Sequence, residues 1–488
     1  MSAPPTTAVP GPRAPGDTTP SPRPPDARGG HVRRLLPPAR RRWWGDAVAW
    51  LVGAHLGVVT AFWVSAGGAG LLLQGGATAL GSAGRLAGLW ASALLLLQVL
   101  GMARIPAAER AFGQDRLTTW HRWAGFTSFW LLALHLVLIV VAYASAEGRG
   151  PVAELWSMTL TLPGMLLAVA GTALITGVVV LSVRAARRRL RYESWHLLHL
   201  YAYLGIGLAL PHQLWTGSSF LAHPWTAAYW WSLYGLTLVA LLTFRVARPL
   251  LLSARHRLRV AAVVQETPTI VSVHVTGRRL DRLRVEAGQF LVWRFRTGAG
   301  WTRGHPLSLS AQPTTAGLRV TIGVRGDDGA RLAAMGPGTP VLVEGPFGRT
   351  ATSVRTRHRI AAFAAGAGIA PVVALLQDNA WTPGSDTLVH RVTDPSEAAL
   401  RADAEWLAEH AALRYVPLPG PRSRTGTPWL PAEHGHVPGP DALRRLVPDL
   451  VHHDVFVCGP AAWSTALVAD LRAAGVPERQ IHLESYAW

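Results

Sequence analysis

Residues 118–143 read TTWHRWAGFTSFWLLALHLVLIVVAY. The stretch is long enough for an α-helix to cross the ~30 Å hydrocarbon core of a membrane at 1.5 Å per residue. It nevertheless contains two histidines, His121 and His135, fourteen positions apart. Because an ionisable side chain is costly inside a spanning helix, each is a candidate functional residue. Fourteen residues give ~21 Å of rise and return to nearly the same helix face, which predicts two imidazoles at two depths.

A second apolar stretch, at 194–214, repeats this arrangement. It contains His199 and His212, whose separation of thirteen residues corresponds to ~19 Å of helical rise. Two imidazoles that face each other at one depth form the ligand set of a b-type haem, since neutral imidazole is a good iron donor. The spacing therefore predicts two haems, an inner one between His121 and His199 and an outer one between His135 and His212.

The geometry of this second stretch leaves some assignments open. On an ideal helix His212 is rotated ~140° away from His199, and we expect a π-bulge or a distortion at Pro211 to restore its direction. The alternative for any one histidine is a hydrogen bond to a neighbouring helix, which is our interpretation of His55. His196, one turn inside His199, is predicted to contact a haem propionate or the cytoplasmic face.

Six such apolar segments occupy the first half of the chain. Each is about 20 residues long, the length of a membrane span, and they cover 46–66, 85–103, 118–143, 161–183, 194–214 and 225–247. Arginine-rich connections alternate with connections that carry almost no arginine. The positive-inside rule then predicts a multi-pass cell-membrane protein whose N-terminus, and everything after residue 250, is cytoplasmic. Arg85, at the outer end of the second segment, either pairs with an outer haem propionate or extends to the lipid headgroups.

The composition agrees with a membrane protein. Among 488 residues, 49% are hydrophobic and 15% are charged, against about a quarter charged in soluble proteins. The net charge of +19 comes from arginines beside apolar runs, which indicates membrane topology and not a nucleic-acid-binding surface. A single cysteine, Cys458, excludes disulfides, cysteine-ligated zinc and cysteine-held iron–sulfur clusters. The proline-rich residues 1–42 are predicted to form a disordered cytoplasmic tail.

The pattern changes after residue 255. Short β-branched runs between Gly, Pro and Asp turns predict a small antiparallel β-barrel over 255–350. Strands and helices then alternate over 355–488, which is typical of a doubly wound α/β domain. We therefore expect a multidomain membrane protein in which a six-helix transmembrane bundle at 43–250 precedes an FAD-binding barrel and an NAD(P)-binding α/β domain.

The barrel contains candidate flavin contacts. One run places small hydroxyls and backbone amides at a strand edge, where they suit a flavin ring and its phosphates, and consists of His305, Pro306, Leu307 and Ser308. Arg325 and the glycine turn that follows it offer a cation and free amides to a pyrophosphate. The turn at 344–348, EGPFG, closes the barrel and is as readily structural as functional.

A glycine loop opens the first helix of the α/β domain. Residues 364–371 read AAGAGIAP and place Gly366, Gly368 and Pro371 between an apolar strand and a helix. The missing side chains let a pyrophosphate approach the backbone, and the helix N-terminus favours the anion. The loop is therefore a candidate nucleotide site.

Other candidates lie near the ends of later strands. A run of three residues, Cys458, Gly459 and Pro460, ends one strand, and the terminal Trp488 is either a core contact or a cover over the flavin ring. Three arginines either bind the 2′-phosphate of NADPH or are solvated at the surface, and they are Arg391, Arg422 and Arg424. No acidic residue clearly ends the strand before Arg391, which favours NADPH over NADH.

With these motifs in order, residues 45–488 resemble the NAD(P)H oxidase and ferric reductase superfamily. That family joins a six-helix ferric-reductase-like domain to a ferredoxin-reductase-like dehydrogenase. The resemblance implies haem ligation by the four histidines at 121, 135, 199 and 212. It also implies an NAD(P)H loop at 366–371, a nicotinamide-side motif at 458–460 and a flavin-covering Trp488. The run at 305–308 is similar to the family's His-Pro-aromatic-Thr/Ser flavin motif, with Leu307 in the aromatic position.

The implied activity is that of an NAD(P)H-dependent flavohaem oxidoreductase. A hydride would pass to FAD beside Cys458 and Trp488, and single electrons would pass through both haems to a small molecule on the outer face. A flavin is needed because a nicotinamide gives two electrons and a haem takes one. The transfer is expected to be electrogenic.

This interpretation leaves two candidates for the terminal electron acceptor. A ferric chelate is favoured by association with the family, and oxygen is the alternative. Two other classes are a membrane-anchored flavin reductase with purely structural helices and a haem subunit whose dehydrogenase half only docks.

Overall fold

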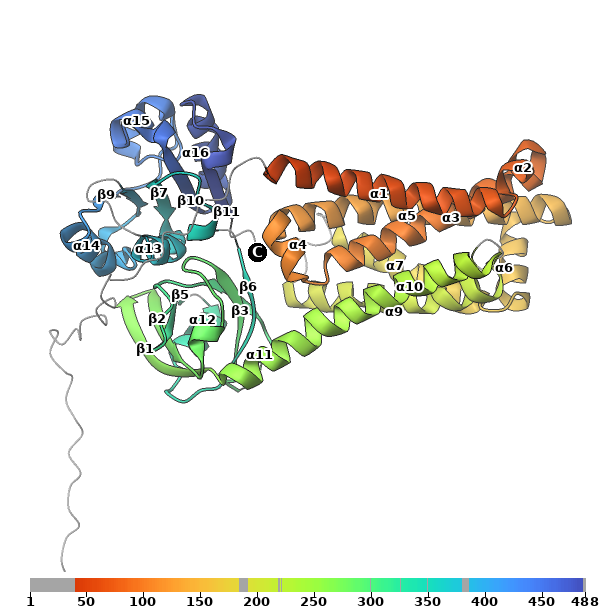
Figure 1. Cartoon of the computed structure of the whole chain (residues 1–488), viewed down its shortest axis with the longest axis horizontal. Helices are drawn as coiled ribbons and strands as arrows, with labels where there is room; N and C mark the ends of the chain where they lie inside the picture. The colour runs from red at the N-terminus through yellow and green to blue at the C-terminus, as the bar shows by residue number, and fades with distance from the viewer. Residues whose placement is uncertain are drawn as a thin grey trace, which may run out of the picture.

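The computed structural model describes residues 40–183, 192–217, 220, 222–298, 300–324, 326–348, 350–379 and 386–485. A long helical bundle lies beside two β-containing units at one of its ends (Figure 1). The tail predicted at 1–42 lies outside the described residues up to position 39, and its last three residues begin the first helix. Arg325 and Trp488 also lie outside the described residues.

The bundle has a helix at each of the six apolar segments. These helices are α1 (Arg40–Ser65), α3 (Gly76–Gly101), α5 (Gln114–Glu147), α7 (Met165–Ser182), α9 (Tyr192–Trp215) and α10 (Pro224–Leu241). Among the described residues, five helical stretches are long and apolar enough to cross a membrane. α9 is not one of the five, because polar residues, three histidines among them, interrupt it. The count of six spans therefore stays a prediction.

Short helices and small residues complete the bundle. α2 (Gly68–Leu73) and α6 (Pro151–Thr161) lie at the end away from the β units, and α4 (Pro106–Phe112) lies at the near end (Figure 1). α3 packs along α5, and α7 packs along α9. A Cβ atom at Gly171 of α7 would lie 2.6 Å from the Gly205 carbonyl oxygen of α9, so glycine is required for this close approach.

The first β unit consists of two three-stranded antiparallel sheets around a shared core. One has the order β1-β2-β5 and the other β4-β3-β6. The strands are β1 (Arg259–Thr267), β2 (Ile270–Thr276), β3 (Phe290–Phe295), β4 (His305–Ser308), β5 (Leu318–Gly323) and β6 (Val341–Phe347), with the helix α12 (Gly326–Ala333) after β5. An isolated bridge between Leu309 and Val320 joins the two sheets. The antiparallel arrangement agrees with the prediction, and the sheets are closed only by such isolated bridges.

The second β unit is a five-stranded parallel sheet of order β11-β10-β7-β8-β9. Its strands are β7 (Arg359–Ala365), β8 (Thr387–Arg391), β9 (Arg414–Leu418), β10 (His453–Gly459) and β11 (Ile481–Ser485). Helices cover both faces: α13 (Ile369–Gln377) and α14 (Arg401–His410) contribute to one core, and α15 (Gly439–Leu446) and α16 (Ala461–Ala473) to the other. The predicted α/β domain is confirmed. Its first helix begins at Ile369, after a 3₁₀ turn, so Pro371 lies inside the helix and not before it.

A buried ion pair joins the two β units. Arg319 of β5 donates to both carboxylate oxygens of Asp403 on α14, at 3.2 and 2.9 Å, and Gln377 of α13 donates to the same carboxylate at 3.1 Å. The two charged side chains are 6% and 9% exposed. Because removal of either partner would leave a buried charge, this pair holds the two units in a fixed contact.

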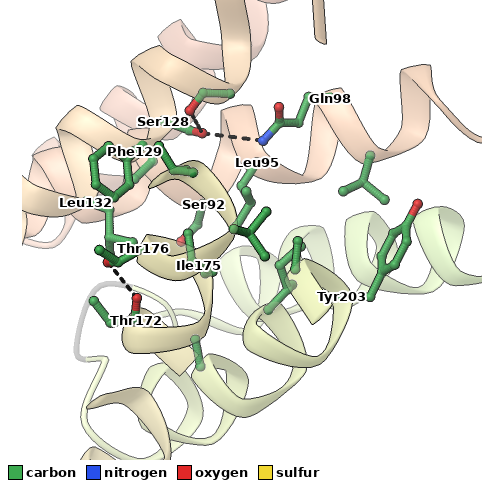
Figure 2. Close-up of a pocket in the computed structure, with 18 of the residues that line it drawn as sticks. Ser92, Leu95, Gln98, Ser128, Phe129, Leu132, Thr172, Ile175, Thr176 and Tyr203 are labelled. Carbon is green, nitrogen blue, oxygen red and sulfur yellow. Dashed lines mark hydrogen bonds between the residues drawn. The ribbon is translucent and has the colours of Figure 1, made fainter. Parts of the chain in front are cut away.

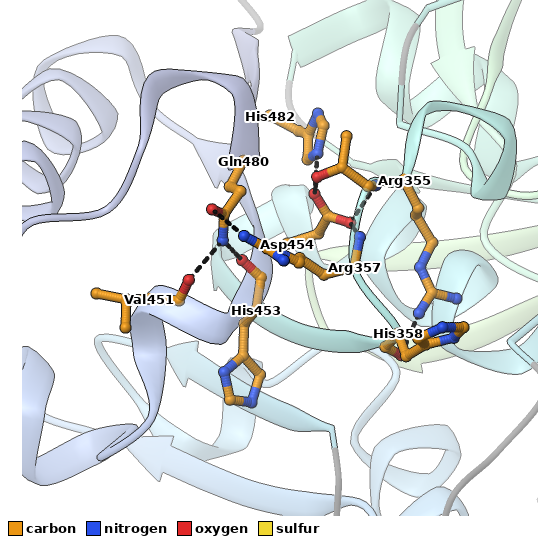
Figure 3. A network of polar contacts seen from close by, with 9 residues as sticks. Arg355, Arg357, His358, Val451, His453, Asp454, Gln480 and His482 are labelled. Carbon is orange, nitrogen blue, oxygen red and sulfur yellow. Dashed lines mark hydrogen bonds and ion pairs between the residues drawn. The ribbon is translucent and has the colours of Figure 1, made fainter. Parts of the chain in front are cut away.

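A second buried carboxylate, that of Asp454, joins the segment before β7 to the strands β10 and β11 (Figure 3). Asp454 of β10 accepts hydrogen bonds from the Thr356 amide at 2.6 Å and from its hydroxyl at 2.9 Å. It also accepts from the Arg357 amide at 2.6 Å and from Nε2 of His482 on β11 at 2.9 Å. Burial alone raises the pKa of Asp454, but His482 and the two amides outweigh it, so the pKa lies below its ordinary value.

We expect this network to make stability fall in acid. A carboxyl whose pKa is lower in the folded state stabilises above its unfolded pKa of ~3.9 and loses that contribution as the pH falls through the folded value. The unfolding temperature of the detergent-solubilised chain should therefore decrease more steeply below about pH 4 in the wild type than in Asp454→Asn. Glu433→Gln, which changes a carboxyl that is exposed at the surface of the same domain, should keep the wild-type slope. Equal slopes in wild type and Asp454→Asn would contradict the assignment.

Candidate functional site

A continuous cavity of ≈ 2760 Å³ extends through the helical bundle to the β4-β3-β6 sheet. Pockets for single small ligands are usually ~300–1,000 Å³, so this one has room for more than one group. The structure brings all four predicted haem-ligand histidines to its wall, and they are His121, His135, His199 and His212.

The inner pair has the separation that an iron would need. The ring centroids of His121 and His199 are 5.8 Å apart, with the ring planes at 75°. Two metal–imidazole bonds of about 2 Å, added to the half-widths of the rings, give a separation of roughly 6 Å. His199 Nδ1 lies 3.3 Å from the Ser182 hydroxyl. His121 Nδ1 is buried and has no hydrogen-bond partner in the described part of the chain.

In the outer pair, His135 and His212, each ring uses Nδ1 for a hydrogen bond and leaves Nε2 as the nitrogen that can bind a metal. His135 Nδ1 lies 2.8 Å from the Gly84 carbonyl oxygen, and His212 Nδ1 lies 2.5 Å from the Ala209 carbonyl oxygen. A ring nitrogen must be protonated to donate to a carbonyl, so in each ring Nε2 carries the lone pair. This is the usual arrangement of a histidine that binds a metal through Nε2. A Cβ atom at Gly88 would lie 2.7 Å from His135 Nδ1, so glycine provides the space for this ring.

The expected π-bulge in α9 is absent. α9 is α-helical over Tyr192–Trp215, and the irregularity inside it is Pro211, which has no N–H to bond the Gly207 carbonyl. His199 and His212 nevertheless line the same cavity. The π-helical segment of the bundle lies in another helix, at η1 (Leu242–Ala247).

The part of the cavity between the two histidine levels is mostly apolar. Figure 2 shows Leu95, Phe129, Leu132 and Ile175 on the cavity wall, beside hydroxyl and amide side chains such as Ser128 and Gln98. Two of those polar groups have local partners: Gln98 donates to Ser128 at 3.4 Å, and the Thr176 hydroxyl donates to the Thr172 carbonyl at 2.8 Å. The side-chain oxygen of Gln98 is buried and has no hydrogen-bond partner among the described residues. The apolar part of such a lining suits a large apolar ring.

The remaining membrane residues separate into two groups. His55 is hydrogen-bonded to the Tyr229 hydroxyl and is not part of the cavity wall, as expected for a structural histidine. His196 and Arg85 both line the cavity. Among the described residues, no group of three or more His, Cys, Asp or Glu side chains could hold a metal ion.

The predicted flavin run faces the same cavity. His305 and Pro306 line it, and the run forms β4 at the edge of its sheet. Leu307 pairs with Leu291 of β3, and its carbonyl accepts a hydrogen bond from the Trp293 indole at 3.0 Å. Ser308 is buried beside Phe290. The cavity thus connects the flavin run to the histidines of α5 and α9.

The glycine loop lies where the strand order of the parallel sheet reverses. β8 and β9 follow on one side of β7, and β10 and β11 lie on its other side. Ligands of such sheets bind at the carboxyl ends of the strands at this point. Gly366 has φ +55°, and a Cβ atom at Gly368 would overlap the Cys458 carbonyl. Pro371 is buried in the first turns of α13.

The three residues that end β10 lie directly against this loop. Cys458 pairs with Ala364 of β7 and with Glu484 of β11. A Cβ atom at Gly459 would lie 2.8 Å from the Trp463 ring, and Pro460 caps α16. Burial raises the pKa of the Cys458 thiol well above its usual range, with a further contribution from Glu484. Cys458 is thus fully buried where the end of β10 meets the glycine loop.

Comparison with known proteins agrees with this geometry. Residues 87–210 match the family described as ferric reductase like transmembrane component. Over 239 residues the chain is 30% identical to the ferredoxin reductase component of 3-ketosteroid-9-alpha-monooxygenase from Mycolicibacterium smegmatis, covering 47% of this chain and 65% of that protein. The chain joins a ferric-reductase-like transmembrane domain to a ferredoxin-reductase-like FAD/NAD-binding domain. The resemblance inferred from the motifs is thereby confirmed.

Two further proteins are similar to part of the chain. The ferric-reductase-like chain is 26% identical over 212 residues to the flavohemoprotein of Xylella fastidiosa, covering 41% of this chain and 51% of that one. The flavohem-like FAD/NAD-binding domain of nitric oxide dioxygenase from Vibrio cholerae is 20% identical, with a TM-score of 0.39, and the match covers 47% of this chain and 98% of that one. The chain spans between half and two thirds of the curated relatives' length. Its helices include five stretches, among the described residues, that are long and apolar enough to cross a membrane.

Two features of this ferric-reductase-like chain differ from sequence expectation. The guanidinium of Arg391 donates to the carbonyls of Val392, Leu418 and Gly420, so it anchors the loop after β9. The other 2′-phosphate candidates, Arg422 and Arg424, are exposed.

Sequence reasoning also missed a charged group on the cavity wall, which consists of Arg104, Arg245, Arg294 and Glu344. The available signal was a glutamate in an otherwise apolar strand.

Proposed function

We propose that this chain transfers electrons from cytosolic NAD(P)H, through FAD and two b-type haems, to an acceptor on the outer face of the cell membrane. The observation that carries the proposal is the continuous cavity. Its wall includes His305 and Pro306 of the flavin run and the four histidines of α5 and α9. When bound, FAD and haem supply the change from hydride transfer to single-electron transfer, which protein side chains do not provide.

The residues of the chain have distinct roles in this proposal. His121 and His199 hold the inner haem, and their 5.8 Å ring separation supports this. His135 and His212 hold the outer haem, which is supported by their Nδ1 contacts to backbone carbonyls. A purely structural helical domain would not need four histidines around a cavity of this size.

The dehydrogenase part supplies the electrons. The strand at 305–308 lines the flavin, and the loop at Gly366 and Gly368 binds the pyrophosphate of NAD(P)H at a helix N-terminus. NADPH is favoured, with Arg422 or Arg424 at its 2′-phosphate. The arginine-rich connection around α4 lies at the dehydrogenase end of the bundle (Figure 1), so the positive-inside rule makes this end cytoplasmic.

A ferric chelate is the acceptor that the outer end of the cavity favours. α3 begins and α5 ends at this end, and the wall there includes Thr78, Arg85, Tyr143 and Glu147. Oxygen requires only a small apolar pocket, whereas charged and hydroxyl side chains can bind a charged chelate. We therefore propose a ferric or other metal reductase.

The test is a reduced-minus-oxidised spectrum of the purified full-length protein, with haem quantified as its pyridine haemochrome. We expect about two b-type haems per chain, reduction by NADPH more readily than by NADH, and faster turnover with ferric citrate than with oxygen. A well-folded, flavin-containing protein without haem would reject the proposal and leave a membrane-anchored flavin reductase.

A further inference from the structure

A buried glutamate gathers three arginines where the bundle meets the first β unit. Glu344 of β6 is 8% exposed. Its carboxylate lies 3.7 Å from Arg104 Nε, 3.8 Å from a terminal nitrogen of Arg245 and 3.6 Å from a terminal nitrogen of Arg294. The arginines come from the turn after α3, from η1 and from β3. We call these four residues the Glu344 cluster.

Two backbone irregularities bring the membrane-side arginines to this glutamate. Arg104 has φ +66°, a left-handed conformation that is costly for a residue with a Cβ atom. Its guanidinium lies 4.3 Å above the centroid of the Phe347 ring, also on β6. Arg245 belongs to the π-helical segment, a rare conformation that occurs often at functional sites. Its Nε donates to the Met102 carbonyl at 3.2 Å, which ties η1 to the end of α3.

Docking alone does not require this cluster. The helix α11 (Arg248–His256) already packs against β6, where the Ser253 hydroxyl accepts a hydrogen bond from the Val343 amide at 3.2 Å. Leu252 of α11 packs on the core of the same unit. Apolar side chains usually stabilise a buried contact as well as or better than ion pairs do. Four buried or half-buried charges therefore indicate a need for one defined geometry.

The cluster is positioned to fix the flavin run relative to the inner histidines. Val292 of β3 pairs with Pro306 of the flavin run on one side and with Glu344 on the other, so the three residues form one row across the sheet. Adjacent strands are ~4.8 Å apart, which puts Glu344 roughly 10 Å from Pro306. On the bundle side, His196 lines the same cavity as the cluster, one helical turn from His199.

We propose that Glu344 is a positioning residue that holds the dehydrogenase in register with the bundle, so that the flavin run faces the His121–His199 level. This inference rests on the proposed function, because a change in register alters a rate only if electrons pass between the two parts. A displacement of ~1 Å in a reacting arrangement can lower a rate by about 10²-fold. Loss of the carboxylate also leaves three arginines that repel one another.

The test uses Glu344→Gln in the full-length protein, with Glu266→Gln as the matched control. Glu266 is in β1 of the same unit and is not part of the cavity wall. Three rates are measured: NADPH-driven reduction of soluble ferricyanide, anaerobic haem reduction by NADPH, and trypsin cleavage between α11 and β1. In Glu344→Gln we expect unchanged ferricyanide reduction, haem reduction at least about 10-fold slower, and faster cleavage. The control should match the wild type in all three.

A second substitution guards against misfolding. Arg245→Gln alters the same cluster from the bundle side, outside the β unit, and should reproduce the slow haem reduction. In the double variant the slowing should be no greater than in Glu344→Gln alone, because that variant has already lost the contact with Arg245. Haem reduction at the wild-type rate in both single variants would overturn the inference. Absence of haem from the wild-type protein would instead contradict the proposed function. In that case, an unchanged rate of trypsin cleavage in Glu344→Gln would by itself reject the docking role of Glu344.

Discussion

His121→Ala is expected to lower the haem content of the purified chain from about two to about one per polypeptide. It should also abolish NADPH-driven reduction of ferric citrate on the outer face. The reason is that His199, its partner at 5.8 Å, cannot by itself provide a six-coordinate bis-histidine site. The measurement is the pyridine haemochrome of the variant, combined with ferric citrate reduction by protein reconstituted into vesicles.

His55→Ala is the matched control for this experiment. His55 is also a histidine of the bundle, but it is hydrogen-bonded to Tyr229 and is not part of the cavity wall. Its removal should leave both haems in place. Reduction of soluble ferricyanide by NADPH should continue in both variants, because ferricyanide takes electrons from the dehydrogenase part. An unchanged haem content in His121→Ala would show that the inner assignment is wrong.

The features that the sequence predicts well are those with strong local signals. Apolar runs of about 20 residues produce helices in the expected places, because the cost of placing unpaired backbone groups in hydrocarbon leaves few alternatives. The spacing of His121 and His135 likewise fixes their helix face, and both line the cavity. The glycine loop lies between a buried strand and a helix as expected, since its residue types permit little else.

The features that the sequence does not predict depend on distant residues. The guanidinium of Arg391 is occupied by carbonyls that lie 27 and 29 positions further along the chain, at Leu418 and Gly420. The Glu344 cluster assembles from residues as far apart as Arg104 and Arg294. Tertiary contacts decide each of these, so local patterns cannot identify them.

Gly368→Ala is expected to remove productive NAD(P)H binding while leaving both histidine levels intact. The added Cβ atom would overlap the Cys458 carbonyl, a backbone atom that cannot rotate away. Nor can the strands separate, because β7 and β10 are paired from His453 with Arg359 to Cys458 with Ala364. The loop must therefore move away from the carboxyl edge of the sheet. Overpacking of this kind costs about 1–3 kcal/mol of stability, and displacement by ~1 Å can lower the rate of a bound substrate about 10²-fold.

The measurement is ferricyanide reduction as a function of NADPH concentration, with the haem and flavin spectra recorded on the same sample. Gly336→Ala is the matched control, because it makes the same change where nothing lies within 4 Å of the added Cβ atom. It should match the wild type. In Gly368→Ala the spectra should be retained while turnover with NADPH is lost, which separates a damaged nucleotide loop from general unfolding. Wild-type turnover in Gly368→Ala would mean that the nucleotide does not depend on contact between this loop and the end of β10.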